Sequence, residues 1–141
     1  MRLWHKDFIH ILPKQQLLGQ WRECCAIAKA TLDGNLNHLL VNKVNSYPID
    51  HLFSYCVLVG KEMERRGIKV NPERILVYFY PFSEKAERPL QEIPQDELFP
   101  GWHNERYLIQ CLHNLQEKYD CGGISEKEWD IIFKEFPAIC L

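Results

Sequence analysis

Residues 15–23 read Gln15-Gln16-Leu17-Leu18-Gly19-Gln20-Trp21-Arg22-Glu23, and they lie in the longest stretch of the chain with helical spacing of apolar residues. Apolar residues recur here at helical spacing as far as Leu32, which predicts one long amphipathic helix. Pro13 suits the first helical position, and Gly34 follows the segment as a stop signal. The sequence therefore predicts a helix over residues 13–32.

The polar side of this helix carries an adjacent cation and carboxylate. At about 100° per residue, Arg22 falls at the edge of the apolar arc and Glu23 nearly opposite its centre. Such a pair is most often a solvated helix face. Gly19, one turn before Glu23, costs about 1 kcal/mol of helix propensity, so we expect a packing reason such as a close backbone neighbour.

Three further helices are predicted along the chain. The second spans about residues 48–66 and the third about residues 103–119, each followed by a glycine stop. A short fourth helix begins at a capping box made by Ser125 and Glu128 and ends near Phe136. The spacing of apolar residues assigns each helix one buried face.

Five prolines between the second and third helices predict a long irregular crossing. They are Pro72, Pro81, Pro89, Pro94 and Pro100. Because proline breaks regular helices, we expect only residues 75–80 to form a short strand or a buried helical turn there. The predicted fold is all-α: one domain over residues 1–141, a compact bundle of three main helices with a short C-terminal helix and this crossing.

Composition fits one ordinary globular domain. The chain has 141 residues, of which 46% are apolar and 26% charged, and no apolar run is long enough to span a bilayer. The first residues lack the apolar core of a signal peptide, so we expect a cytoplasmic protein without a membrane anchor. We expect a monomer.

Neither the cysteines nor the histidines form a recognisable cofactor motif. The six cysteines include no C-x-x-C pair, and four of them fall in apolar helical patterns, which favours reduced core thiols. No histidine spacing is typical of zinc, and no glycine-rich phosphate loop is present. We therefore expect no metal and no cofactor.

The stretch around Arg22-Glu23 fits the pattern Q-x-L-[LM]-[GA]-x-[WY]-R-E, about twenty residues from the N-terminus. This pattern resembles the pyrimidine-dimer DNA glycosylases of the phage endonuclease V type. The resemblance implies a DNA repair glycosylase with abasic-site lyase activity on damaged double-stranded DNA. It also implies that an N-terminal strand-like segment crosses between the helices and brings the terminal amine to the glutamate.

On this resemblance Met1, Glu23 and Arg22 are the catalytic residues. The α-amine of Met1 attacks the anomeric carbon of the damaged nucleotide, the base leaves, and a Schiff base permits strand scission by β-elimination. An α-amine has an ordinary pKa of about 7.7–8.0, so part of it is neutral near pH 7. Because Arg2 is large, we expect Met1 to be retained, whereas the best understood family members expose threonine.

The resemblance also implies a set of DNA-binding residues. They are Arg2, Lys29, His38, Lys43, His103 and Lys118. His103 has a competing interpretation, a capping or core hydrogen-bond role. Asn114 stands where the family places an arginine, whereas Lys118 keeps its counterpart.

A non-catalytic helical module that binds nucleic acid or a protein is the alternative function. The formal net charge of −2 favours it, because non-specific DNA affinity depends on Lys and Arg displacing counterions from phosphates. A local stripe of positive charge would matter more than this sum.

Overall fold

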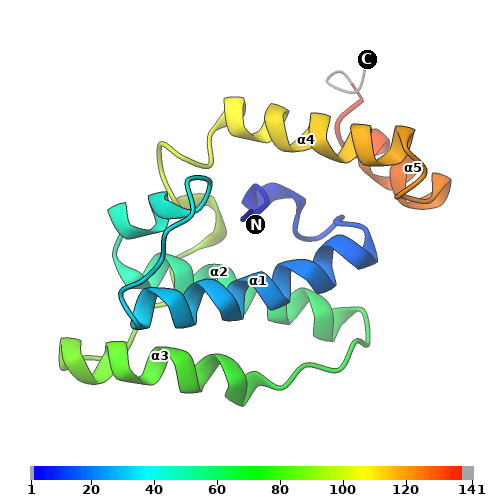
Figure 1. Cartoon of the computed structure of the whole chain (residues 1–141). Coiled ribbons are helices and arrows are strands. Elements are labelled where there is room, and N and C mark those ends of the chain that lie inside the picture. Colours follow the sequence, from blue (N-terminus) through cyan, green and yellow to red (C-terminus); the bar gives the residue numbers. More distant parts are fainter. Residues whose placement is uncertain (1, 138–141) are drawn as a thin grey trace.

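The computed structural model of the chain describes residues 2–137 (Figure 1). Within that range the chain forms no β-strand and five α-helices: α1 (Lys14–Leu32), α2 (Ile49–Arg65), α3 (Pro72–Ala86), α4 (Glu105–Asp120) and α5 (Glu126–Glu135). Three short 3-10 helices accompany them: η1 (Lys6–Phe8), η2 (Asn42–Ser46) and η3 (Gln95–Glu97). The predicted all-α fold is therefore confirmed.

The helices form two groups with the N-terminal segment between them. In Figure 1, α1, α2 and α3 lie together on one side, and α4 with α5 lies on the other. Apolar residues from both groups and from the segment share one hydrophobic core. None of the described helices combines the length and apolarity needed to cross a bilayer.

Four helices begin and end close to their predicted limits. Helix α1 places Leu17, Cys24 and Ala28 in the core, as the spacing predicts. At the start of α5, the Ser125 hydroxyl accepts a hydrogen bond from Glu128 N at 3.2 Å, and Ser125 N donates to the Glu128 carboxylate at 3.4 Å. This reciprocal pair is the predicted capping box.

Helix α3 corrects the prediction that the proline-rich segment holds no long helix. Pro72 is the first residue of α3, where a missing N–H costs nothing, and Asn71 caps the helix by accepting from Glu73 N at 3.1 Å. Pro81 lies inside the helix and costs about 3 kcal/mol. Ile75 and Phe79 are buried, and each contributes about 1.5–3 kcal/mol in return.

The irregular crossing is thus confined to residues 87–104. Asp50 of α2 binds the first part of this crossing. The Asp50 carboxylate accepts two hydrogen bonds from the Arg88 guanidinium, both at 2.9 Å, and one from Gln91 N at 2.7 Å. The bonds from Arg88 hold the pKa of the Asp50 carboxyl below its usual value. The carboxylate therefore stays ionised and anchors the crossing to α2.

Two glycines inside helices give a matched test of packing. A Cβ built on Gly60 meets the Trp21 ring at 3.0 Å, whereas one on Gly19 meets only the Arg22 Nη2 atom, at 3.9 Å. Helix α2 therefore needs glycine where α1 packs on it, and α1 does not need Gly19 for packing. The expected close backbone neighbour of Gly19 is not found among the described residues.

We predict that Gly19→Ala raises the free energy of unfolding by about 0.5–1 kcal/mol through helix propensity. Gly60→Ala gains the same propensity but is expected to be less stable than Gly19→Ala by about 1–3 kcal/mol, because its methyl group overpacks Trp21. Urea unfolding of both variants measures the difference. Equal stability of the two would contradict the described contact between Trp21 and Gly60.

Candidate active site

The first residues cross between the two groups of helices (Figure 1). Leu3, Trp4 and Phe8 are buried and anchor this N-terminal segment in the core. The Lys6 side chain is also buried, and its ammonium donates to the carbonyl oxygens of Asp96 and Leu98. The crossing segment implied by the family resemblance is therefore present, and it is held along its length.

Gln20 of α1 binds the backbone of this segment much as a neighbouring β-strand would. Its Oε1 atom accepts from Trp4 N at 2.6 Å, and its Nε2 atom donates to the Arg2 carbonyl at 2.8 Å. Gln20 is only 1% exposed, and its bond to Trp4 N is buried, whereas its bond to the Arg2 carbonyl is partly buried. One carboxamide thus fixes both the position and the register of residues 2–4 against α1.

Two tyrosines complete this support. The Tyr55 hydroxyl lies 2.5 Å from the Trp4 carbonyl and 2.8 Å from Gln20 Oε1, and its single proton can go to either oxygen. The Tyr107 hydroxyl of α4 donates to the Leu3 carbonyl at 2.5 Å. Burial raises the pKa of both tyrosines, so the hydroxyls keep their protons and remain donors.

Glu23 lies at the start of the chain. Its Oε2 atom accepts from Arg2 N at 3.1 Å and from Gln20 Nε2 at 3.3 Å, and the residue is half-buried. Gln20 and Glu23 are three residues apart and so share one face of α1. Met1 lies outside the described residues. The predicted pairing of Glu23 with the chain's start is therefore seen as far as Arg2.

The two arginines beside Glu23 differ in surroundings. Arg22 is exposed on α1, and its guanidinium lies near Gly19. The Arg2 guanidinium lies 5.2 Å from the centre of the Trp4 ring, a cation–π distance. Arg2 also lines a hollow, and this places a positive charge at an opening next to Glu23.

Two adjoining hollows open beside α4, one next to the N-terminal segment and the connection after α1, the other next to η2 and the turn before α4. One, of about 320 Å³, is lined by Arg2, Leu40, Tyr107, Gln110, His113 and Asn114. The other, of about 380 Å³, shares Tyr107 and Gln110 and adds Lys43 and Arg106. The predicted DNA-binding residues Arg2 and Lys43 therefore line neighbouring hollows, together with Arg106, which was not predicted.

The structure argues against a direct DNA contact for His103. Its side chain is buried, and its Nδ1 atom accepts from Lys6 N at 3.0 Å. Burial lowers the pKa of His103 to about 2, so the ring is neutral near pH 7 and offers no charge to a phosphate. The core hydrogen-bond role that was its competing interpretation accounts for it.

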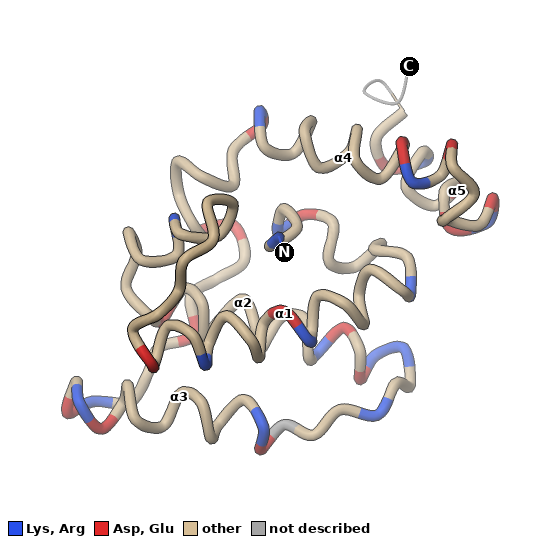
Figure 2. Tube along the Cα trace, viewed as in Figure 1, with Lys and Arg blue, Asp and Glu red and all other residues tan. Residues whose placement is uncertain are grey.

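The other predicted DNA-binding residues lie apart from this centre. Lys29 is exposed on α1, about 9 Å along the helix from Glu23. Lys118 is exposed on α4, about 16 Å along that helix from Tyr107. His38 is half-buried in the connection after α1. Figure 2 shows Lys and Arg positions spread over several elements, with Asp and Glu positions among them on α5.

The thiols next to Glu23 are not nucleophiles. Cys24 and Cys25 are buried and free, as are Cys56 and Cys111, whereas Cys121 is exposed. Burial raises the pKa of the Cys24 and Cys25 thiols, which keeps them protonated. The prediction that four cysteines lie in the core is confirmed, and Cys140 lies outside the described residues.

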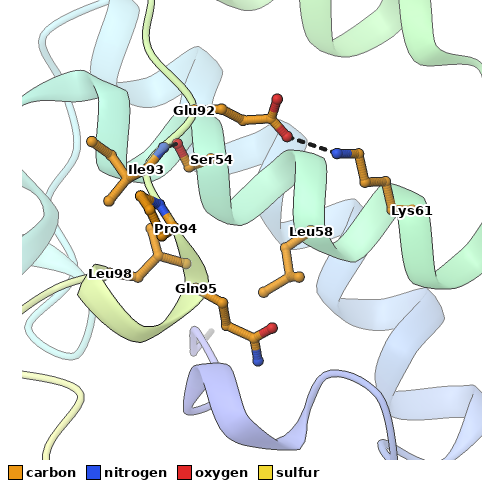
Figure 3. A pocket seen from close by; sticks show the side chains of 8 residues that line it. All are labelled: Ser54, Leu58, Lys61, Glu92, Ile93, Pro94, Gln95 and Leu98. Carbon is orange, nitrogen blue, oxygen red and sulfur yellow. Dashed lines mark hydrogen bonds and ion pairs between the residues drawn. The ribbon is translucent and has the colours of Figure 1, made fainter.

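A hollow on another face of the molecule lacks comparable chemistry. It measures about 220 Å³ and lies between α2 and residues 92–98 (Figure 3). Its one cation, Lys61, points at Glu92 and pairs with it at 2.7 Å. Within residues 2–137, no group of three His, Cys, Asp or Glu side chains could hold a metal ion.

Gln20, Tyr55 and Tyr107 were not predicted as site residues. Gln20 occupies an unspecified position of the quoted pattern and looks like an ordinary polar residue of an amphipathic helix. Its place three residues before Glu23 is the one available clue, because residues at this spacing share a helix face. The two tyrosines come from helices far away in the sequence.

We predict that Gln20→Leu lowers the free energy of unfolding by about 2–5 kcal/mol, because Trp4 N and the Arg2 carbonyl both lose their partner. Gln15→Leu is the matched control, since Gln15 is exposed on the same helix. Urea unfolding checks both variants. A Gln20→Leu protein as stable as the control would show that this side chain does not hold the segment.

A comparison with known protein families gives an assignment independent of the geometry. The family described as pyrimidine dimer DNA glycosylase matches residues 1–76, just over half of the chain. A search of curated proteins and a search of solved structures each found no match. The matched range contains the N-terminal segment, Gln20 and Glu23, so it includes the residues brought together at the chain's start. The chain therefore belongs to the pyrimidine dimer DNA glycosylase family.

Proposed function

We propose that this DNA repair glycosylase cleaves damaged double-stranded DNA as a glycosylase and abasic-site lyase, with the α-amine of Met1 as nucleophile. The observation that carries the proposal is the hydrogen bond from Arg2 N to Glu23 Oε2, 3.1 Å long. Three covalent bonds join the α-amine to this nitrogen, so the two nitrogens are at most about 4 Å apart. The amine is therefore tethered within reach of the carboxylate.

The proposed reaction proceeds in two stages. The neutral amine attacks C1′ of the damaged nucleotide, the bond from C1′ to the base breaks, and the base leaves with the electron pair. Loss of a proton from the nitrogen and opening of the sugar ring give a Schiff base. Removal of a proton from C2′ then expels the 3′ phosphate and cuts the strand.

Glu23 has two roles in this scheme. As a carboxylate beside the amine it stabilises the cationic sugar, and it moves protons between the amine, the sugar and water. Its orientation comes from two donors, Arg2 N and Gln20 Nε2, so it is aligned before the substrate binds. We propose that Arg22, exposed on the same helix, binds a phosphate next to the reacting nucleotide.

The neighbouring hollows supply the rest of the DNA contact. Arg2 lines one hollow and Lys43 and Arg106 line the other, and such a local group of cations attracts phosphates even though the whole chain carries a net charge of −2. Lys29 and Lys118 extend the proposed contact along the duplex. We propose that the protein acts as a cytoplasmic monomer.

We predict that Glu23→Gln lowers the rate of strand scission on a duplex with one abasic site by roughly 10²–10³-fold. The amide oxygen can still accept from Arg2 N, so folding and DNA affinity should be retained. Single-turnover cleavage and anisotropy measure the rate and the affinity. Glu64→Gln, on the exposed side of α2, is the charge-matched control.

Blocking the N-terminus with a peptide tag should remove scission in the same way while leaving binding intact. Glu23→Gln protein that cuts at the unaltered rate would contradict the proposed role of the carboxylate. Binding of damaged and intact duplex with equal affinity, and no cutting of either, would favour the non-catalytic module.

A further inference from the structure

Two leucines protrude from the connection between α1 and η2. Leu39 is 90% exposed and Leu40 is 53% exposed, so neither contributes much to the core. Single exposed leucines are common on protein surfaces and need no explanation. These two leucines are adjacent, however, and they lie on a well-ordered turn beside the candidate active site. Their exposure there requires an explanation.

The turn is held from both ends by hydrogen bonds. The His38 carbonyl accepts from Val41 N at 3.0 Å and from Asn42 N at 2.9 Å. In return His38 N donates to the Asn42 side chain at 3.0 Å, and Leu40 N donates to His38 Nδ1 at 3.3 Å. Val41 is fully buried and anchors the turn in the core. The leucines therefore project from an ordered turn.

The turn lies at the candidate active site. Leu40 lines the same hollow as Arg2, and Arg2 N bonds to the Glu23 carboxylate. In Figure 1 the connection after α1 rises toward the N-terminus and the start of α4. Lys43, two residues beyond the turn, lines the adjoining hollow. The apolar tip thus shares one hollow with Arg2, and Lys43 lines the adjoining hollow, so cations that can bind phosphate lie near it.

We propose that Leu39 and Leu40 form a wedge that inserts into the base stack of duplex DNA beside the lesion; this inference rests on the proposed function. Apolar side chains inserted between base steps unstack and kink a duplex. A damaged or abasic position is already poorly stacked, so the wedge enters there at the lowest cost. The wedge opens the path from the α-amine to C1′ and favours damaged over intact duplex.

His38 gains a role in this arrangement. Its ring nitrogen and its carbonyl oxygen both hold the turn, so it positions the wedge and need not touch a phosphate. Another group of large exposed apolar side chains, Leu76, Val77 and Tyr80 on α3, is separate from this turn in the sequence. Nothing in the structure shows what covers it, and it provides the control.

The test uses the full-length chain with a duplex that carries one abasic-site analogue and a neighbouring 2-aminopurine, whose fluorescence rises when it is unstacked. We expect a clear rise with the unaltered protein and at least a threefold smaller rise at saturation with Leu39→Ala and Leu40→Ala. Leu39→Met keeps a long apolar side chain and should restore the signal. Leu76→Ala, 57% exposed on α3, should behave like the unaltered protein.

Cleavage assays distinguish failure of the wedge proposal from failure of the proposed function. The alanine variants should cut an abasic duplex at least tenfold more slowly than the unaltered protein, but a single-stranded abasic oligonucleotide at the same rate. Unchanged fluorescence and unchanged duplex cleavage in both variants would overturn the wedge. If the unaltered protein unstacks the duplex through these leucines but cuts no substrate, the wedge stands and the proposed function fails. Failure to bind the duplex would overturn both.

Discussion

The arrangement of the candidate active site depends on the two hydrogen bonds that the Gln20 carboxamide makes to the backbone of the N-terminal segment. An extended segment buried in an all-helical molecule has no neighbouring strand, yet its backbone N–H and C=O groups still require partners. Gln20 provides one donor and one acceptor in the geometry of a strand, to the Arg2 carbonyl and to Trp4 N. These bonds fix the position of residues 2–4 relative to α1 and so bring Arg2 N to the Glu23 carboxylate.

Other backbone groups of the N-terminal segment also find their hydrogen-bond partners in side chains. Tyr55 binds the Trp4 carbonyl, Tyr107 binds the Leu3 carbonyl, and His103 accepts from Lys6 N. These three side chains come from α2, α4 and the turn before α4, so the segment links elements that are distant in the sequence. The bonds made by Tyr55 and His103 are buried and that of Tyr107 is partly buried, so they are costly to break and keep the site aligned before a substrate arrives.

Helical spacing predicted α1, α2, α4 and α5 because each buries one face, and caps and glycine stops marked their ends. Helix α3 could not be predicted in this way, because Pro81 argues against a helix and only the tertiary burial of Ile75 and Phe79 offsets it. At the site, the pattern around Glu23 pointed to the carboxylate. Gln20 and Tyr107 were missed because they bind the backbone of residues 2–4, a stretch too short to show any periodicity.

The central claim is that the chain's own α-amine, held against Glu23, forms the covalent bond to DNA. Borohydride trapping on an abasic duplex, followed by mass spectrometry of the digested adduct, tests it directly, because reduction fixes the Schiff base on the nitrogen that formed it. We predict one adduct, on the peptide that begins at Met1, at its α-nitrogen. An adduct on a lysine side chain such as Lys6, or no adduct with protein in large excess, would contradict the account.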